Sequence, residues 1–457
     1  MGLDLLPSVF LGAIVFFARL TQWHFYLGRR LKGMFLSSAD TWIFLIDAKK
    51  IREHGFKLSS RIRGESVEAD KYYPPLFFYL LAVIPENFVK PMVKYGPALA
   101  DAFISLILTI STILITNNVV LAALAAGVYL SSPMIFQQTF CFCIRPLSIL
   151  LVSFIYLFSL NFSWFNFLVI SVLVAFILLL HKFAAQVVLF TSLAFLFIGR
   201  FDYLLSVAAG FLISRAISKG YYLKVLKAHV DHLKSSYLKQ FVYSRTESPL
   251  RKTAALAIYC PWILFFTASI FVLWGNIFSA SLISSFVWII TLALFAVLTN
   301  FWRFRIIGEG WRYLGYMVFP LAFWAASAVN YSSNLLWAYA PFIVAGIAIG
   351  YYYVLRLFGR HQKYLVSEAD TEIFKEISAI EGRTIAALPK EFTYPISYFS
   401  GKDYATKLEL DFEERAAELA DIVVLNKEYA GAPLYEGLRK RGYTARLEKD
   451  KWIAYAR

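Results

Sequence analysis

The feature that most constrains this chain is a series of apolar stretches, each long enough to cross a lipid bilayer as a helix. A span needs about 20 mostly apolar residues, and a helix satisfies its own backbone hydrogen bonds inside the membrane. We predict about eleven spans, at residues 5–27, 97–116, 119–136, 146–162, 166–181, 183–199, 201–217, 254–275, 279–300, 313–331 and 334–355. The sequence therefore predicts a mostly α-helical, polytopic membrane bundle.

The composition agrees with membrane insertion. The chain is 59% hydrophobic and 16% charged, whereas soluble domains have about 45–50% apolar and about 25% charged residues. A formal net charge of +15 could indicate a nucleic-acid partner, but the basic residues lie in loops between spans and form no separate basic domain. We therefore expect no nucleic acid as a partner and expect these cations to meet phosphate-bearing lipids.

Three polar regions interrupt the spans and define the predicted domains. A membrane domain, residues 1–358, contains a long first loop at 28–96 and a basic loop at 218–253. Within the first loop, residues 76–84 follow a Pro-Pro pair and are too short to span, so we predict a helix lying in the membrane interface. The third region, 359–457, is more polar and predicts a small soluble α/β domain.

The soluble domain alternates helical and strand patterns. The segment "SEADTEIFKEISAI" opens with a helix-capping pattern, "RTIAAL" and "DIVVL" are typical of strands, and "FEERAAELA" is typical of a helix. The segment "GAPLYEGLRKRGY" predicts a helix ended by Gly442, and "TARLEK" with "KWIAYAR" predicts a terminal hairpin. The domain has no Gly-rich phosphate loop and no catalytic triad pattern. We predict a docking or lid domain.

The basic residues raise a question of sidedness. Nearly all Lys and Arg residues fall in 28–96, in 218–253 and in the tail, and the order of the spans places these three regions on one side of the membrane. The positive-inside rule would make that side cytoplasmic. Cations that bind an anionic substrate could override the rule, so the residues alone leave the sidedness open.

Two carboxylates follow the first span directly, in "SSADTWIFLIDAKKIREHG". An acidic residue in or beside a span is costly and is functional by default. Asp40 is expected to be partly desolvated and can act as a general base toward a hydroxyl group. It can equally be a helix N-cap, because "SSAD" precedes an apolar run. Asp47, two turns later, is expected to pair with Lys50 or Arg52.

A second polar cluster lies between two late spans, in "RFRIIGEGWRYLGY". The guanidinium groups of Arg303 and Arg312 match phosphate oxygens, and the hydroxyl of Tyr313 adds a neutral donor. Two structural interpretations compete with phosphate binding. The basic residues can be interfacial side chains that extend toward the headgroups, and Glu309 can pair with Arg312 one helical turn away.

Histidines at two places are further candidates. His181 and Lys182 open a span, where the histidine is either structural or, with the lysine, a phosphate contact. His229 and His232 are three residues apart on a basic amphipathic stretch, with Asp231 beside them. Two histidines without a third ligand do not define a metal site, so an interfacial helix is the favoured interpretation.

Together these segments resemble the GT-C superfamily of multi-spanning glycosyltransferases. The resemblance rests on an Asp soon after the first span, a long first loop returning through "YYPPLFFYLLA", and a "GEGWRYLGY" loop before a late span. Members take sugars from polyprenyl-phosphate carriers, and they include protein O-mannosyltransferases and aminoarabinose transferases. The resemblance covers about residues 1–355. It implies an integral protein of the plasma membrane whose active site faces outside.

The resemblance also implies roles for single residues. Asp40 matches the catalytic first-loop carboxylate, and Arg312 with Tyr313 matches the late-loop residues that hold the carrier phosphate. Metal-dependent members carry a second acidic motif between the third and fourth spans, where this chain has "SSPMIFQQTFCFCIRPLS" and no acid. We therefore expect no cofactor, with a divalent metal left open as an alternative that no acidic second motif supports, and we expect Arg145 to stabilise the leaving phosphate. The other donor-phosphate candidates are His181 and Lys182, and the other loop candidates are Asp47, Lys71, Tyr73, Glu309, Arg303, His229 and His232.

The implied function is transfer of a sugar from a polyprenyl-phosphate-linked donor to the hydroxyl of a lipid, glycan or protein acceptor. The reaction would invert the anomeric carbon, with Asp40 as general base. Two alternatives stay open at this point. One is a polysaccharide polymerase or ligase that uses Arg and His residues of the 218–253 loop. The other is a transporter or flippase of an anionic lipid-linked substrate, although the sequence has no evident inverted repeat.

Overall fold

The computed structural model of the protein describes most of the chain. The described residues are 5–28, 34–35, 39–57, 73–139, 142–231, 248–276, 280–301, 304, 307–332, 334–361, 366–404, 420–428 and 432–457. They form two compact units. The first, here the helical unit, comprises Met1–Arg29, Pro97–Phe140 and Ile144–Phe358. The second, here the α/β unit, comprises Arg30–Gly96, Cys141–Cys143 and Gly359–Arg457. The long first loop therefore belongs with the C-terminal residues.

The predicted spans are helical in the structure, with differences in their bounds. The helices are α1 (Leu5–Trp23) with a following π-helix (His24–Gly28), α4 (Glu86–Thr116), α5 (Val119–Leu130), α6 (Pro133–Thr139), α7 (Arg145–Ser159), α8 (Trp164–Leu180), α9 (Lys182–Phe195), α10 (Phe201–Ile217), α12 (Pro249–Tyr259), α13 (Trp262–Leu273), α14 (Ala280–Leu298), α15 (Gly310–Tyr331) and α16 (Leu335–His361). Short 3-10 turns follow α9 at Leu196–Ile198 and α13 at Trp274–Asn276.

Three of these bounds correct the prediction. Helix α4 begins at Glu86, well before residue 97, because the polar first turns continue the helix without a break. The chain leaves the helix at Ser131 and Ser132, so the predicted span 119–136 is divided between α5 and α6. The loop predicted between the spans 119–136 and 146–162 is therefore partly helical, since α6 extends to Thr139. The predicted span 254–275 is likewise two helices, α12 and α13, which meet at an angle of 81°.

The number of complete membrane crossings differs from the prediction of about eleven. Among the described residues, two helical segments are long and apolar enough to cross a membrane, Glu86–Leu114 and Leu335–Arg356. Two bent pairs would bring the number to four: Phe201–Ile217 with Tyr221–Asp231, and α12 with α13. Within the described residues, the shorter apolar helices of 10–17 residues are Val119–Leu130, Arg145–Ser159, Trp164–Leu180, Lys182–Ile198 and Leu282–Leu298. The apolar helices and the composition make the chain an integral membrane protein.

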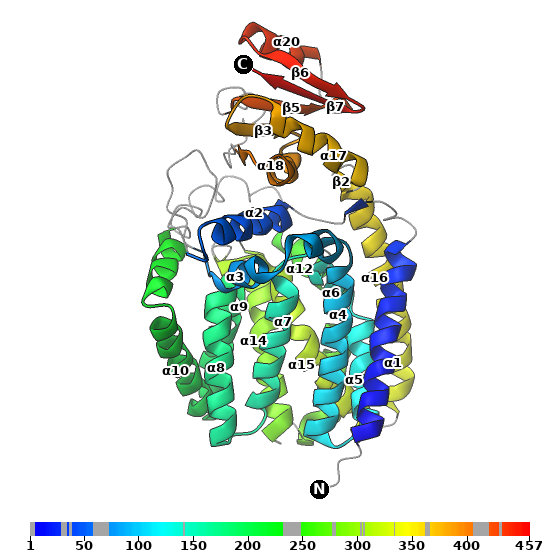
Figure 1. Ribbon diagram of the computed structural model, residues 1–457. Coiled ribbons are helices and arrows are strands. Elements are labelled where there is room, and N and C mark those ends of the chain that lie inside the picture. Colours follow the sequence, from blue (N-terminus) through cyan, green and yellow to red (C-terminus); the bar gives the residue numbers. More distant parts are fainter. Residues whose placement is uncertain are drawn as a thin grey trace. The chain divides into compact units, whose positions relative to one another are not determined.

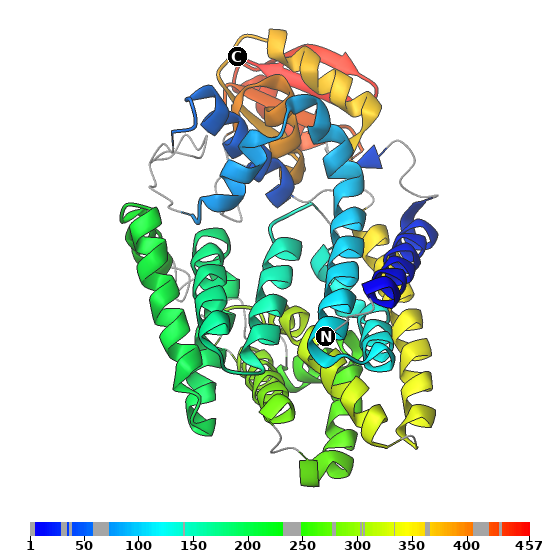
Figure 2. The same cartoon turned by 60° about the horizontal axis from the view of Figure 1, so that its bottom comes forward.

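Helix α15 forms the centre of the helical unit. Its residues from Tyr313 to Val329 are all buried, and it packs against α5, α6, α7, α13 and α14. Helices α7, α8 and α10 run side by side next to this centre in both views (Figures 1 and 2). A helix that is apolar on every side is expected at the middle of a bundle, where no face meets solvent.

Serine hydroxyls and aromatic side chains connect the helices across this core. The indole N–H groups of three buried tryptophans donate to serine Oγ atoms of other segments, and a buried tyrosine pairs with a fourth serine. Interhelical hydrogen bonds of this kind contribute about 0.6 kcal/mol each in a membrane. The pairs are Trp324 with Ser269 at 2.8 Å, Trp288 with Ser159 at 3.1 Å, Trp262 with Ser131 at 3.2 Å, and Tyr156 with Ser285 at 2.6 Å.

The C-terminal part of the α/β unit contains a five-stranded mixed sheet. The strands are β3 (Thr384–Leu388), β4 (Asp403–Tyr404), β5 (Ile422–Asn426), β6 (Thr444–Lys449) and β7 (Trp452–Ala456), in the order β4-β3-β5-β7-β6. Strands β4 and β5 run parallel to β3, whereas β7 is antiparallel to both β5 and β6. Every residue of β5 and β7 is buried, as expected for central strands with both faces covered.

Helices cover the two faces of the sheet. Helix α17 (Glu368–Glu376) begins with a capping box of Ser367 and Asp370, as the sequence predicts, and its Phe374 ring contacts Trp452. Helix α20 (Ala432–Lys440) packs its Leu438 into a core with β5 and β7. The predicted strands, the terminal hairpin and the helix ending before Gly442 are all confirmed. The predicted helix "FEERAAELA" lies outside the described residues.

The first loop supplies further elements to the α/β unit. These are β1 (Met34–Phe35), α2 (Ala39–Glu53) and α3 (Leu76–Val83), and the last confirms the helix predicted after the Pro-Pro pair. Strand β1 pairs antiparallel with β2 (Val366–Ser367). Helix α2 packs on α3 and on α18 (Thr393–Ser400). The Trp42 ring of α2 lies 5.5 Å from the ring of Tyr398 and 5.3 Å from that of Phe399, so the C-terminal domain holds α2 directly.

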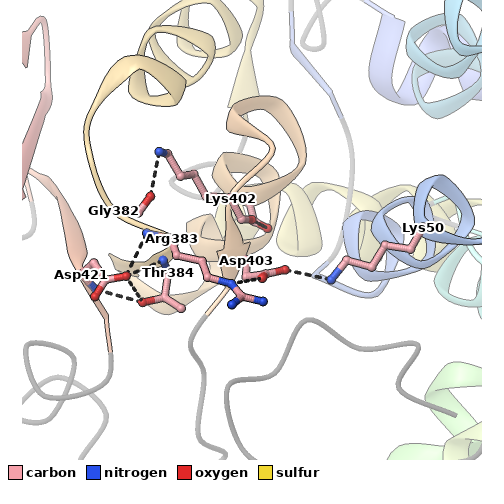
Figure 3. A network of polar contacts seen from close by, with 8 residues as sticks. Lys50, Gly382, Arg383, Thr384, Lys402, Asp403 and Asp421 are labelled. Carbon is pink, nitrogen blue, oxygen red and sulfur yellow. Dashed lines mark hydrogen bonds and ion pairs between the residues drawn. The ribbon is translucent and has the colours of Figure 1, made fainter. Parts of the chain in front are cut away.

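A polar network joins α2 to the edge where the parallel strands begin (Figure 3). Asp403 binds Lys50 Nζ at 3.0 Å and Arg383 Nε at 3.3 Å. One carboxylate oxygen of Asp421 accepts from the backbone N–H groups of Arg383 and Thr384 and from the Thr384 hydroxyl, each at 2.9 Å. These hydrogen bonds, led by that from the Thr384 backbone, hold the pKa of Asp421 below its usual value against the opposing effect of burial.

Candidate functional site

Three helices of the helical unit begin close to one another. Helix α7 begins at Arg145, α9 at Lys182 and α15 at Gly310, and α7 packs against both α9 and α15. The Phe183 ring of α9 lies 4.6 Å from the Tyr313 ring of α15. The first turns of helices present unpaired backbone N–H groups and a partial positive charge. Their convergence makes this end of the unit favourable for an anion.

His181 lies between α8 and α9, in extended backbone conformation, at the centre of this arrangement. Its side chain is buried, and its Nδ1 atom is 3.1 Å from the hydroxyl oxygen of Tyr316. That hydroxyl is 2.9 Å from Ser148 Oγ, and Ser148 Oγ donates to the Arg145 carbonyl oxygen at 2.8 Å. A continuous hydrogen-bond chain therefore runs from the histidine to the first turn of α7.

Two guanidinium groups stand around the Trp311 ring near this histidine. The Arg145 guanidinium carbon lies 5.7 Å from the centre of the ring, and that of Arg312 lies 5.4 Å from it. Both guanidinium groups interact electrostatically with the ring of His181. The ion pair between Glu309 and Arg312, which the sequence offered as an alternative to phosphate binding, is also present: Arg312 Nε is 2.9 Å from Glu309 Oε2. Both partners of that pair are exposed, so the pair contributes only about 0–1 kcal/mol.

Tyr313 differs from the expected phosphate ligand. Its side chain is fully buried, and its hydroxyl donates to the Ile307 carbonyl oxygen at 3.2 Å. Because the hydroxyl hydrogen is used within the protein, Tyr313 holds the loop that precedes α15. The loop also requires glycine at position 308. The φ of Gly308 is +132°, and an added Cβ would lie 2.6 Å from Phe183. The loop is therefore anchored on α9.

The two acids of the first loop are placed differently from the expectation. Helix α2 begins at Ala39, so Asp40 lies in its first turn and does not cap it. Asp40 is exposed, whereas partial desolvation was expected. Asp47 is the buried one, with 1% of its surface exposed. Asp40 is thus more exposed than predicted. Asp47 lies in the middle of α2, where nearly all side chains are buried, whereas Asp40 lies in the first turn.

The other first-loop candidates take structural positions. Lys50 pairs with Asp403, and Arg52 donates to the backbone oxygens of Ala82 and Ile84. The ring of Tyr73 contacts Phe44 and Phe78. Lys71, Arg303 and His232 lie outside the described residues. His229 is on the helix Tyr221–Asp231, where its Nε2 is 3.1 Å from Gln186 Nε2 of α9.

The residues present do not fit a divalent metal site of the kind that metal-dependent GT-C members carry. The segment from Ser131 to Ser148 has amides and Arg145 in place of carboxylates. Across the described ranges, no three His, Cys, Asp or Glu side chains form a group that could hold a metal ion. We assign no chemical step to a metal.

Sequence reasoning missed one charged cluster, at the α1–α4 contact. The Arg19 Nε atom is 2.7 Å from Asp101 Oδ2, and neither side chain is exposed to solvent. The Trp23 indole and the Tyr129 hydroxyl also donate to the Asp101 carboxylate, at 2.9 Å and 2.7 Å. Arg19 further donates to the Leu130 carbonyl oxygen at the end of α5. The signal was available, because a charged residue inside a predicted span is expected to be paired or functional.

Comparison with known proteins defines the fold. The chain has the GT-C fold. It is similar to the crystal structure of ArnT, an aminoarabinose transferase of the GT-C family, from Cupriavidus metallidurans bound to undecaprenyl phosphate, with a TM-score of 0.62 and 11% identity. It is equally similar to the apo structure of that protein, with 12% identity. In both cases 98% of this chain and 97% of ArnT are covered. No protein-family model and no curated protein sequence matches the chain.

Proposed function

We propose that this protein transfers a sugar from a polyprenyl-phosphate-linked donor to an acceptor hydroxyl on a lipid, a glycan or a protein. The main observation in support of this proposal is the cluster of Arg145, Lys182 and Arg312 at the starts of three helices around His181. Guanidinium groups and helix N-termini are the groups that bind phosphate best in proteins. Since the cluster belongs to an apolar helical unit, a phosphate carried on a lipid chain is its natural ligand.

The fold supports the same donor class. ArnT, whose fold this chain has, was crystallised with undecaprenyl phosphate bound. By that analogy the carrier phosphate of this protein would bind among the cations of the helical unit. Positioned cations stabilise the charge that appears on the leaving phosphate, which is usually the largest electrostatic contribution to such a reaction.

We assign the proton transfer to Asp40. The acceptor hydroxyl must lose a proton as its oxygen attacks the anomeric carbon, and the sugar–phosphate bond breaks as the new bond forms, with inversion. Asp40 is an exposed carboxylate in the first turn of α2, and a carboxylate can take up this proton as a general base. The packing of Trp42 on Tyr398 and Phe399 holds this helix. The active site would face outside the plasma membrane.

The direct test is turnover by the purified protein in detergent. We expect that incubation with a panel of polyprenyl-phosphate sugars and with membrane extract as acceptor releases polyprenyl phosphate from at least one donor. Transport of the intact donor into vesicles, with no release of lipid phosphate, would identify a flippase and contradict the proposal. A polymerase that depends on the basic loop would lose activity in His229→Gln, which the proposal expects to remain active.

A further inference from the structure

Three consecutive helices of the helical unit are short for a membrane crossing. Helices α8 and α10 have 17 residues each, and α9 has 14 residues followed by a 3-10 turn of 3 residues. At a rise of about 1.5 Å per residue, a helix of this size is about 26 Å long. The hydrocarbon core of a typical bilayer is about 30 Å thick, and any tilt of a helix shortens its reach across that core. Each of the three helices therefore falls short of such a core.

Turns in the backbone fix where each of these helices ends. Helix α8 is followed by His181, in extended conformation, and α9 begins at the next residue. The 3-10 turn after α9 ends at Gly199, whose φ is +73°, and the chain returns as α10. Helix α10 ends before Lys219 and Gly220, which both have positive φ, and the next helix, Tyr221–Asp231, is bent by 113° from it. None of the three helices therefore continues beyond its apolar segment in the same direction.

Charged and aromatic side chains mark both ends of these helices. At the end where α8 and α10 begin, Arg200 Nε is 2.8 Å from Asp202 Oδ1, and Trp164 is exposed. Tryptophan is enriched at the level of the lipid headgroups. At the end where α10 finishes, Arg215 and Lys219 are exposed. Because charged groups are costly in the hydrocarbon core, headgroups and water are expected to meet the helices at both ends.

Between these ends the helices present apolar side chains to their surroundings. Helices α8 and α10 pack on each other and lie at one edge of the helical unit in both views (Figures 1 and 2). An exposed apolar face on an integral membrane protein is suited to contact with acyl chains. The large apolar side chains that the two helices expose are Leu168, Val172, Phe176, Leu205, Leu212 and Ile217.

Helix α16 gives the helical unit a side of a different length. Its apolar segment, Leu335–Arg356, has 22 residues and is therefore about 33 Å long. Val344, near the middle of that segment, is exposed. The α16 side can thus cross a bilayer of ordinary thickness, whereas the α8 and α10 side cannot. A bilayer can adapt to a short apolar segment by becoming locally thinner, at a cost that grows with the mismatch in length.

We propose that the bilayer is thinned along α8 and α10, and that this side of the protein selects phospholipids with short acyl chains. The headgroups then reach the Arg200–Asp202 pair at one end of the helices and Arg215 with Lys219 at the other. Because α9 begins at Lys182, directly after α8 ends, lipid phosphates on this side lie level with the start of α9. The thinning goes beyond the proposed function and would hold whether or not the protein transfers a sugar.

The test measures which lipids surround each side of the full-length protein. A bimane fluorophore is attached to Val172→Cys, in the middle of α8, or to the matched control Val344→Cys on α16, after replacement of the native cysteines by serine. Each labelled protein is reconstituted in an equal mixture of two phosphatidylcholines, one with chains of about 14 carbons and one with chains of about 22. One lipid is brominated at a time. Because bromine quenches a fluorophore only at close range, the two samples give the ratio of short to long lipid beside each label.

We expect the short-chain lipid to be favoured at least about twofold at position 172, because the long chains match the short helices poorly, and not to be favoured at position 344. Both labelled proteins should unfold at the temperature of the unlabelled protein, since both valines are exposed. Equal ratios at the two positions, or a preference for long chains at position 172, would refute the proposal. If neither lipid quenches the label at position 172, protein covers this side in place of lipid, and the proposal is refuted as well.

Discussion

At the residue scale, the two acidic side chains of the first loop differ in their exposure to solvent. Asp40 is exposed in the first turn of α2, while Asp47 is buried on the same helix. The sequence indicated that an acid after the first span is functional. It could not indicate which acid faces solvent, since the two are seven residues apart and lie on nearly the same side of a helix. The tertiary partners of α2, which are distant in sequence, decide the burial.

Asp421 provides a prediction on pH. Its folded-state pKa is lowered by hydrogen bonds from Thr384 and Arg383, so its contribution to stability is complete above the unfolded-state pKa of about 3.9 and is lost as the pH falls through the folded-state value. We expect Asp421→Ala to lower the unfolding midpoint of the α/β unit at pH 7, and the difference from wild type to shrink below about pH 4. Thermal unfolding at several pH values measures this. An equal difference at pH 7 and pH 3 would refute the electrostatic account.

At the element scale, most helices and strands were predictable, because apolar periodicity and capping residues act locally. The capping box of α17 and the buried strand β5 are examples. The breaks in the helices were harder to predict. The division at Ser131 and Ser132 occurs where Arg19 and Gln22 of α1 both donate to the Leu130 carbonyl oxygen. A partner more than 100 residues away thus ends α5, and no local pattern indicates it.

The contact between α14 and α15 depends on a glycine. A Cβ added to Gly310 would lie 2.2 Å from the Ala296 carbonyl oxygen, a backbone atom that cannot move alone. We expect Gly310→Ala to destabilise the helical unit by about 1–3 kcal/mol and to weaken undecaprenyl phosphate binding, since Arg312 is in the same first turn. Unfolding in detergent and the ligand Kd are the measurements.

The matched control for this glycine is Gly437→Ala. Gly437 is also helical, but nothing lies within 4 Å of an added Cβ. That variant should be neutral or slightly stabilised, because alanine favours helix over glycine by about 1 kcal/mol. If the Gly310→Ala protein proves as stable as the Gly437→Ala protein, the close contact between α14 and α15 is refuted.

At the scale of the whole molecule, the fold class was predictable and the grouping of the chain was not. The sequence indicated a helical membrane part and a soluble C-terminal domain. It did not indicate that the first loop joins the C-terminal domain in one unit. Two of the contacts that join them are Trp42 with Tyr398 and Lys50 with Asp403. These pairs are hundreds of residues apart, so only the tertiary structure reveals them.

The proposed sidedness gives a prediction for intact cells. We expect a cysteine introduced at the exposed Glu381 of the α/β unit to react with a membrane-impermeant maleimide from outside. A cysteine at the exposed Asn161, in the turn between α7 and α8, should react only after permeabilisation, because the order of the spans places it on the opposite side. The native cysteines are replaced by serine in both proteins. The reverse labelling pattern would place the tail in the cytoplasm and contradict an outward-facing site.

The most direct test of the account is sugar transfer by Asp40→Asn. Amide replacement keeps the shape of the side chain and removes the base, so we predict that released polyprenyl phosphate falls by about 10²–10⁴-fold, while undecaprenyl phosphate binding stays within twofold or so of wild type. The control is Glu53→Gln, an exposed carboxylate in the last turn of the same helix, which should transfer normally. Transfer by Asp40→Asn at the wild-type rate would contradict the central claim.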